Sequence, residues 1–203
     1  MNKPTAYDTT QAAGEFEPIK LGGHKMVIKQ ISEKKTQGGL DMLVILFDFA
    51  EGDEQAGYFM KQFENDIRPD KKYPNAGTNY MVIDEGVDYG VRNLKTFITC
   101  VEKSNPGFAV KWGDNFGQQF KGKLIGGIFR LEKDWYDNKE VKRHKLAWFR
   151  SIEGIKDADI PEERTTKAYD DHLKEEAIMG SNPAGTDFMS IPDSVADDVL
   201  PFN

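Results

Sequence analysis

The sequence predicts a mainly β protein: a five-stranded barrel of order β-β-β-α-β-β, with a flexible N-terminal arm and a disordered acidic C-terminal tail. Five segments have the alternation or the continuous apolar runs that are typical of strands. One segment switches to the period of an amphipathic helix. The composition turns acidic after residue 155. We therefore expect the arm over residues 1–22, the folded domain over residues 23–156 and the tail over residues 157–203.

Three strands are expected in the first half of the domain. Apolar and polar residues alternate around Met26, which predicts a strand over residues 24–31. Residues 41–50 predict a second strand, and its apolar run indicates burial on both faces or an aromatic face kept for a ligand. A third strand is expected near residues 57–63, and a long polar loop follows it.

The second half of the domain predicts one helix and a hairpin. Apolar residues recur every three or four positions in residues 89–103, which places them on one helical stripe. Strands are expected over residues 124–133 and 139–152, joined by a hairpin tip at residues 134–138. This order is that of the oligonucleotide/oligosaccharide-binding (OB) fold, a five-stranded Greek-key barrel. A split sheet with one helix would have the same order.

The charges divide the chain into two parts. Residues 1–156 hold 24 Lys and Arg against 22 Asp and Glu, whereas residues 157–203 hold 3 against 12, and the whole chain has a formal net charge of −7. Within the tail, residues 165–179 predict a short helix that ends at Gly180. Acidic tails usually serve interaction or solvation. We therefore expect the folded part to contact a polyanion and the tail to contact proteins.

The composition restricts the compartment. No apolar run approaches the roughly 18 residues of a membrane span, and the N-terminus lacks the apolar core of a signal peptide. Cys100 is the single cysteine, so an internal disulfide and a thiolate zinc cluster are both excluded. We expect a cytoplasmic protein without a membrane partner.

The sequence gives no reason to expect enzymatic activity, a cofactor or a metal. His24, His144 and His172 are scattered and lack the spacing of a metal site. Residues 117–123 have the spacing of a phosphate-binding loop, but Leu124 stands where that loop needs a hydroxyl for Mg²⁺. A Gly-x-Ser-x-Gly elbow is also missing from the sequence. These patterns favour a binding protein.

Basic and aromatic residues interleave along the predicted domain. Single-stranded nucleic acid requires both kinds, because cations neutralise phosphates and aromatic faces stack unpaired bases. In an OB fold, the loop between the first two strands and the last hairpin flank the binding face. The candidate DNA-binding residues are Lys34, Lys35, Lys61, Trp112, Lys121, Lys123, Trp135, Tyr136, Lys142, Arg143, Lys145 and Trp148.

The aromatic candidates also have structural explanations. Trp148 lies in the middle of a strand, where a core position is favoured over a ligand contact. Trp112 could equally pack over the end of the predicted helix or contact a ligand. Trp135 and Tyr136 favour function, because an exposed aromatic pair at a polar hairpin tip has little packing reason. The lysines fit a solvated face as well as phosphate contacts.

The tip of the tail resembles the acidic C-terminal peptide of the single-stranded DNA-binding proteins of bacteria and their phages. It reads Asp197-Asp198-Val199-Leu200-Pro201-Phe202, and the peptide of that family ends in Asp-Asp-hydrophobic-Pro-Phe. Residues 104–107 (Ser-Asn-Pro-Gly) and 120–127 (Phe-Lys-Gly-Lys-Leu-Ile-Gly-Gly) resemble phage-encoded members. Asn203 is a departure, because the family usually ends on the phenylalanine itself.

The resemblance implies sequence-independent binding and protection of single-stranded DNA in replication, recombination or repair. It implies that Asp197, Asp198, Pro201 and Phe202 dock on replication or recombination proteins. For a phage-encoded protein, the compartment would be the cytoplasm of the bacterial host. The oligomeric state stays open, with a dimer or a tetramer among the alternatives.

One alternative comes from another class of protein. The net charge of residues 1–156 is only +2, which is low for a strong nucleic-acid binder. The chain could therefore be a protein-interaction or virion structural β-barrel module that does not bind nucleic acid. The two hypotheses differ in whether the protein binds single strands with an affinity that falls as salt rises.

Overall fold

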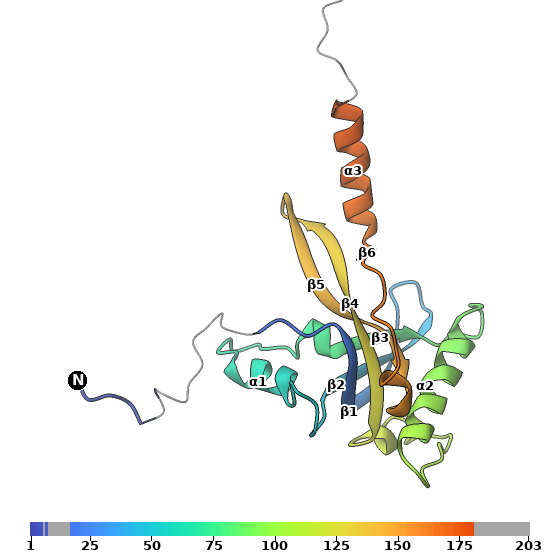
Figure 1. Cartoon of the computed structure of the whole chain (residues 1–203). Coiled ribbons are helices and arrows are strands. Elements are labelled where there is room, and N and C mark those ends of the chain that lie inside the picture. Colours follow the sequence, from blue (N-terminus) through green and yellow to red (C-terminus); the bar gives the residue numbers. More distant parts are fainter. Residues whose placement is uncertain (6, 8–16, 181–203) are drawn as a thin grey trace, which may run out of the picture.

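The computed structural model describes residues 1–5, 7 and 17–180, which form a mainly antiparallel β-sheet with three α-helices (Figure 1). The main elements are β1 (Gly22–Lys35), β2 (Asp41–Phe49), α1 (Tyr58–Asn65), β3 (Thr78–Val82), α2 (Gly90–Ser104), β4 (Leu124–Tyr136), β5 (Lys139–Arg150), β6 (Arg164–Thr165) and α3 (Lys167–Gly180). Three short 3-10 helices are η1 (Asn75–Gly77), η2 (Gln118–Phe120) and η3 (Glu153–Ile155). None of the described helices has the length and hydrophobicity that a membrane crossing requires.

Two predicted features fall partly or wholly outside this range. Residues 6 and 8–16 of the predicted arm and residues 181–203 of the predicted tail lie outside the described residues. The same is true of the partner-docking tip with Asp197, Asp198, Pro201 and Phe202.

The sheet is open between its two edge strands. Its order is β3-β2-β1-β4-β5, and every neighbouring pair on this path is antiparallel. The central strand β1 pairs with β4 over residues 22–27 and with β2 over residues 26–35, and a bulge between Ile28 and Gln30 follows the short stretch where both ladders are present. In the described part of the chain, no ladder joins β3 to β5. The order is compatible with an OB-like fold, but the closed barrel that the sequence predicts is not formed by this pairing.

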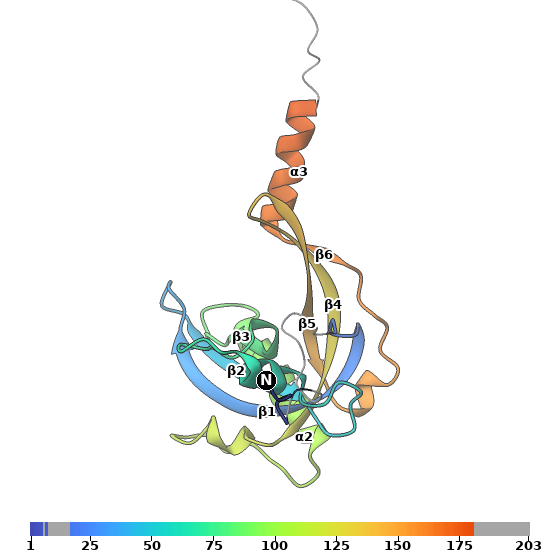
Figure 2. The same cartoon turned by 90° about the vertical axis from the view of Figure 1, so that its left-hand side faces the viewer.

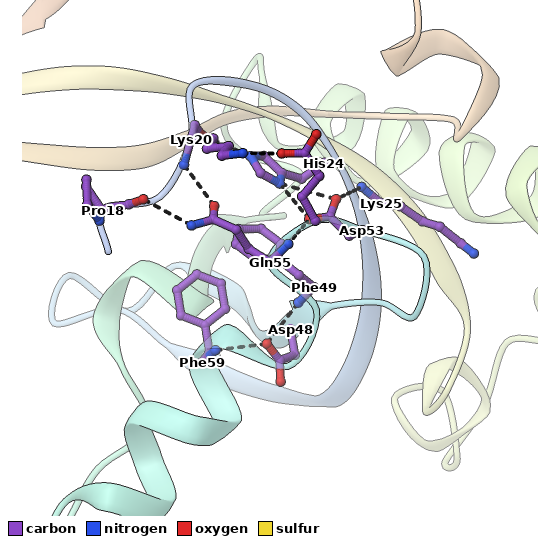
Figure 3. A network of polar contacts seen from close by, with 10 residues as sticks. Pro18, Lys20, His24, Lys25, Asp48, Phe49, Asp53, Gln55 and Phe59 are labelled. Atoms are coloured by element: carbon purple, nitrogen blue, oxygen red, sulfur yellow. Dashed lines mark hydrogen bonds and ion pairs between the residues drawn. The ribbon is translucent and has the colours of Figure 1, made fainter. Parts of the chain in front are cut away.

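The prediction of a strand near residues 57–63 is wrong, because helix α1 lies there. The cause is Asp48, a fully buried residue of β2. Its carboxylate accepts hydrogen bonds from the backbone N–H groups of Phe49 (2.9 Å) and Phe59 (2.9 Å) (Figure 3). It also accepts one from the N–H of Met60 (3.2 Å). Phe59 and Met60 belong to the first turn of α1, whose N–H groups have no partner within the helix. A side chain from another element therefore caps α1.

The other elements of the second half lie close to their predicted positions. Helix α2 and strands β4 and β5 occupy the expected segments, whereas β3 lies within the predicted polar loop. The hairpin tip is shorter than predicted: it consists of Asp137 and Asn138, with φ values of 53° and 56°. Two consecutive positive φ values make the turn that suits the twist of a hairpin. Trp135 and Tyr136 therefore belong to β4, and their prediction as loop residues is wrong.

The core is rich in phenylalanine. Phe47 of β2 packs edge-to-face with Phe59 of α1 at a centroid distance of 5.7 Å, and Phe97 of α2 packs against Phe149 of β5 at 5.1 Å. These rings tie both helices to the sheet, because aromatic contacts of this geometry add to the burial of apolar surface. Cys100 of α2 is buried in the core, and burial raises the pKa of its thiol. A raised pKa disfavours the reactive thiolate, which is typical of a structural cysteine.

Strand β6 and helix α3 attach the start of the acidic tail to the β4–β5 hairpin. The ladder between β1 and β4 ends at Gly22 and Phe129, which leaves the outer half of β4 without that neighbour. Strand β6 pairs there in parallel, opposite Glu132 and Lys133. Helix α3 then stands beside the hairpin and points away from the body of the protein (Figures 1 and 2). This pairing covers a strand edge that would otherwise be open to association.

Candidate nucleic-acid interface

A groove follows the open seam between β3 and β5. Its main hollow has a volume of ≈ 980 Å³. One rim is formed by α1, η1 and β3 and includes Tyr58, Asn75 and Tyr80. The other rim is formed by residues 142–146 of β5. Because no ladder joins β3 to β5 among the described residues, the hollow lies where a closed barrel would have its last ladder.

A second hollow of ≈ 310 Å³ adjoins the first, since both are lined by Asn79 and Tyr80. It adds Tyr89 and Arg92 from the start of α2 and Trp148 from β5. We call the two hollows together the seam groove. Tyr80 is 59% exposed and Trp148 is 38% exposed, so these rings can be reached from solvent. The seam groove thus brings aromatic rings from α1, β3, the start of α2 and β5 to one surface.

The alternation of β5 explains why Trp148 faces the seam groove rather than the core. Its neighbour Phe149 is buried against Phe47 and Phe97, and successive strand residues point to opposite faces. The guanidinium carbon of Arg150 lies 5.5 Å from the centroid of the Trp148 ring. The preference for a core position of Trp148 is therefore wrong, and the ring is a partly exposed groove residue.

Three predicted cations, Lys142, Arg143 and Lys145, share the β5 rim. Each forms an ion pair: Lys142 with Glu140 at 3.6 Å, Arg143 with Asp134 at 3.1 Å and Lys145 with Glu132 at 2.6 Å. The pair of Lys142 and Glu140 is exposed at both ends and contributes little to stability, so a phosphate group can compete for Lys142. Arg143 and Lys145 are partly exposed, whereas their partners Asp134 and Glu132 are largely buried. A hydrogen bond from the Thr166 hydroxyl, together with the charge of Arg143, lowers the pKa of Asp134. Because of this hydrogen bond, the Asp134 carboxylate still has a partner when Arg143 binds a phosphate instead.

The remaining predicted cations and Trp112 lie away from the seam groove. Lys34 and Lys35 end β1, and Lys35 pairs with Asp41 at 2.6 Å. Trp112 is exposed and stacks on Phe116 at a centroid distance of 5.2 Å. The residues of the predicted set that do not line the seam groove are Lys34, Lys35, Lys61, Trp112, Lys121, Lys123, Trp135 and Tyr136.

Trp135 and Tyr136 are not an exposed pair. They are consecutive strand residues, so their side chains point to opposite faces of the hairpin. The ring of Trp135 stacks on His172 of α3, with a centroid distance of 3.4 Å and an interplanar angle of 11°. Tyr136 is exposed. Helix α3 therefore covers one of the two rings that the sequence assigns to base stacking.

Sequence reasoning missed Tyr80, Tyr89 and Arg92. Tyr80 opens the short apolar run Tyr80-Met81-Val82-Ile83, which lies between the turn-forming residues Gly77 and Asp84. Such a run is a strand signal, and it could have located β3. No sequence pattern near β3 or β5 predicts that the two strands approach each other, because their distance depends on the curvature of the whole sheet.

The end of the seam groove is closed by residues 17–20, which we call the strap. Pro18 and Ile19 line the main hollow. The four strap carbonyls accept hydrogen bonds from side chains: Tyr58 Oη to Glu17 (2.6 Å), Gln55 Nε2 to Pro18 (3.0 Å), His144 Nδ1 to Ile19, and His24 Nε2 to Lys20 (2.9 Å). Gln55 also accepts a hydrogen bond from the Lys20 N–H at 2.9 Å (Figure 3). Side chains thus take the place of a backbone ladder along the strap.

The buried pair His24 and Asp53 supports the strap from beneath (Figure 3). His24 Nδ1 lies 3.1 and 3.2 Å from the two carboxylate oxygens of Asp53. Burial raises the pKa of Asp53, but hydrogen bonds from His24 and from the N–H groups of Gln55 and Lys25 outweigh it and leave the pKa lowered. The ring of His24 also stacks on Phe49 at 4.3 Å, so its position is fixed on all sides.

We expect Asp53→Asn to lower the free energy of unfolding by about 2 kcal/mol at pH 6, because hydrogen bonds to a charged group are lost. The folded-state pKa of Asp53 is lowered from its usual value of 3.8. Its contribution is therefore present above that value and is lost as the pH falls through the lower folded pKa. Urea unfolding at pH 6 and pH 3 should show a smaller gap in the free energy of unfolding between parent and variant at pH 3 than at pH 6. An equal gap at both pH values would contradict the assignment.

No protein-family model matches the chain, and no curated protein matches it. A solved structure titled "Yeast RPA bound to ssDNA" is similar to 89% of this chain and to 97% of its own chain, with 12% sequence identity and a TM-score of 0.22. A TM-score of this size does not show a common fold. Within the described residues, no cluster of His, Cys, Asp and Glu is arranged to hold a metal ion.

Proposed function

We propose that this protein binds single-stranded DNA along the seam groove, without sequence specificity and without catalysis. The observation that carries the proposal is the shared location of partly exposed rings, Tyr80 and Trp148, and of cations on β5. Unpaired bases present flat faces to such rings, while the phosphates lie along the cations. Duplex DNA is a poor fit, because its bases are already stacked within the helix.

Two effects supply the affinity in this proposal. Base stacking on one aromatic ring is worth about 1–3 kcal/mol, whichever base is present. Phosphate contacts from Arg92, Lys142, Arg143 and Lys145 release counterions, and this contribution weakens as salt rises. Stacking is therefore the larger part at physiological salt, because only a few cations line the groove.

Binding of a fluorescein-labelled oligothymidine at several salt concentrations tests the proposal. The logarithm of the binding constant should fall linearly with the logarithm of the salt concentration, with a slope of roughly −0.7 per phosphate contact and about −3 for four contacts. A random single strand should compete as well as oligothymidine, and a duplex of the same length should compete poorly. Absence of binding at low salt would reject the function.

Three finer features belong to the same proposal. The open sheet is a variant of the OB barrel in which β3 and β5 separate to admit the strand. The tip with Asp197, Asp198, Pro201 and Phe202 recruits replication or recombination proteins, as the resemblance to bacterial and phage proteins implies. The protein would then work in the cytoplasm, in a bacterial host if it is phage-encoded, during replication, recombination or repair.

A second candidate function is a protein-interaction or virion structural module. The specific observation in its favour is that β3 and β5 each have one edge that pairs with no other strand of the described residues. A peptide strand can add to such an edge through backbone hydrogen bonds. Co-purification of a partner that resists nuclease, together with no oligothymidine binding, would select this function over DNA binding.

A further inference from the structure

The strap connects the two rims of the seam groove. On the β5 side, His144 donates a hydrogen bond to the carbonyl of Ile19. On the opposite side, Tyr58 of α1 donates to Glu17, and Gln55 donates to Pro18. Ile19 itself is buried in the core, which anchors the middle of the strap. The strap thus spans the gap between α1 and β5 at one end of the open seam.

We infer that Gln55 and His144 are positioning residues for the seam groove: through the strap, they hold its two rims at the separation that a single strand requires. This inference rests on the proposed function. Gln55 does not line the groove, so it acts through the strap and not through a contact with DNA. His144 lies on the β5 rim, and its bond to Ile19 fixes that rim to the same strap.

The physical reason is preorganisation. Strands β3 and β5 share no ladder, so their separation depends on the curvature of the sheet and on links across the seam. A groove with mobile rims must lose conformational freedom when DNA binds, and this loss lowers affinity. Loss of the strap should therefore weaken binding without removing any cation that contacts a phosphate.

The test compares Gln55→Ala with the parent in oligothymidine binding. Loss of about one net hydrogen bond predicts a roughly fivefold weaker affinity, with the salt slope unchanged. Gln118→Ala is the matched control, because Gln118 is an exposed glutamine outside the groove, and it should bind like the parent. The combined variant Gln55→Ala/His144→Leu should lose less binding free energy than the sum of the losses in the two single variants. The reason is that both residues act through one strap.

His144 supplies a second test that is independent of the folding of Gln55→Ala. Asparagine places its amide nitrogen close to the position of Nδ1, so His144→Asn should restore most of the affinity that His144→Leu loses. Equal affinity for Gln55→Ala and parent, or equal losses for His144→Asn and His144→Leu, would overturn the inference.

Hydrogen exchange separates failure of the inference from failure of the proposed function. In the DNA-free protein, backbone amides of residues 142–146 should exchange faster in Gln55→Ala than in the parent, because the β5 rim is released. If the parent does not bind oligothymidine, the proposed function fails, and this exchange difference still tests the strap. Unchanged exchange at these amides would overturn the role of the strap by itself.

Discussion

Replacing Tyr80 or Trp148 with alanine is expected to weaken the binding of oligothymidine by about 1–3 kcal/mol in each case, or roughly 5- to 150-fold. The reason is that each ring is partly exposed in the seam groove and offers a face on which an unpaired base stacks. The salt slope should stay unchanged, because no cation is removed. Fluorescence anisotropy of a labelled oligothymidine measures both quantities and does not depend on the tryptophan that is replaced.

Two other aromatic residues provide matched controls for these variants. Tyr136 is 65% exposed and Trp112 is 71% exposed, but neither lines the seam groove. Tyr136→Ala and Trp112→Ala should therefore bind oligothymidine like the parent. Strong losses in these two variants, with little change for Tyr80→Ala and Trp148→Ala, would move the interface to the hairpin and the loop before η2, as the sequence alone predicts.

Asp48→Ala is expected to produce the largest loss of stability, about 3 kcal/mol or more. Its carboxylate is fully buried and accepts hydrogen bonds from three backbone N–H groups, those of Phe49, Phe59 and Met60. Each buried donor that is left without a partner costs about 1–3 kcal/mol. Chemical unfolding followed by circular dichroism measures the change in the free energy of unfolding.

Two further substitutions serve as comparisons for Asp48→Ala. Asp48→Asn keeps one acceptor oxygen and should lose less stability than Asp48→Ala. Asp114→Ala removes an exposed carboxylate and should leave the free energy of unfolding close to that of the parent. If Asp48→Ala is as stable as Asp114→Ala, the carboxylate does not hold the start of α1.

The sequence predicts those helices and strands that are determined by the pattern of apolar residues within their own segment. Helix α2 has its apolar stripe, and β4 and β5 have their alternation, so their approximate positions follow from periodicity. The strand expected near residues 57–63 fails for a different reason. The residues of α1 are compatible with either structure, and the choice is made by Asp48, which belongs to another element.

The candidate site is predictable only in part for the same reason. Lys142, Arg143, Lys145 and Trp148 could be found because they share one basic and aromatic strand. The sequence does not predict that Tyr80 and Tyr89 share a site with these residues. The seam groove forms between β3 and β5, which are the two edge strands of one sheet and lie far apart in sequence. The sequence predicts Trp135 as an exposed ring, because nothing near it in sequence indicates that His172 covers it.

Photo-crosslinking with a bromodeoxyuridine oligonucleotide tests the central claim most directly, because it reports which side chains lie against bases. Mass spectrometry of the digested complex should locate crosslinks at Tyr80 and Trp148, in the peptides that line the seam groove. Crosslinks confined to Trp112, Trp135 or Tyr136, with Tyr80 and Trp148 unmodified at full occupancy, would contradict binding along the seam.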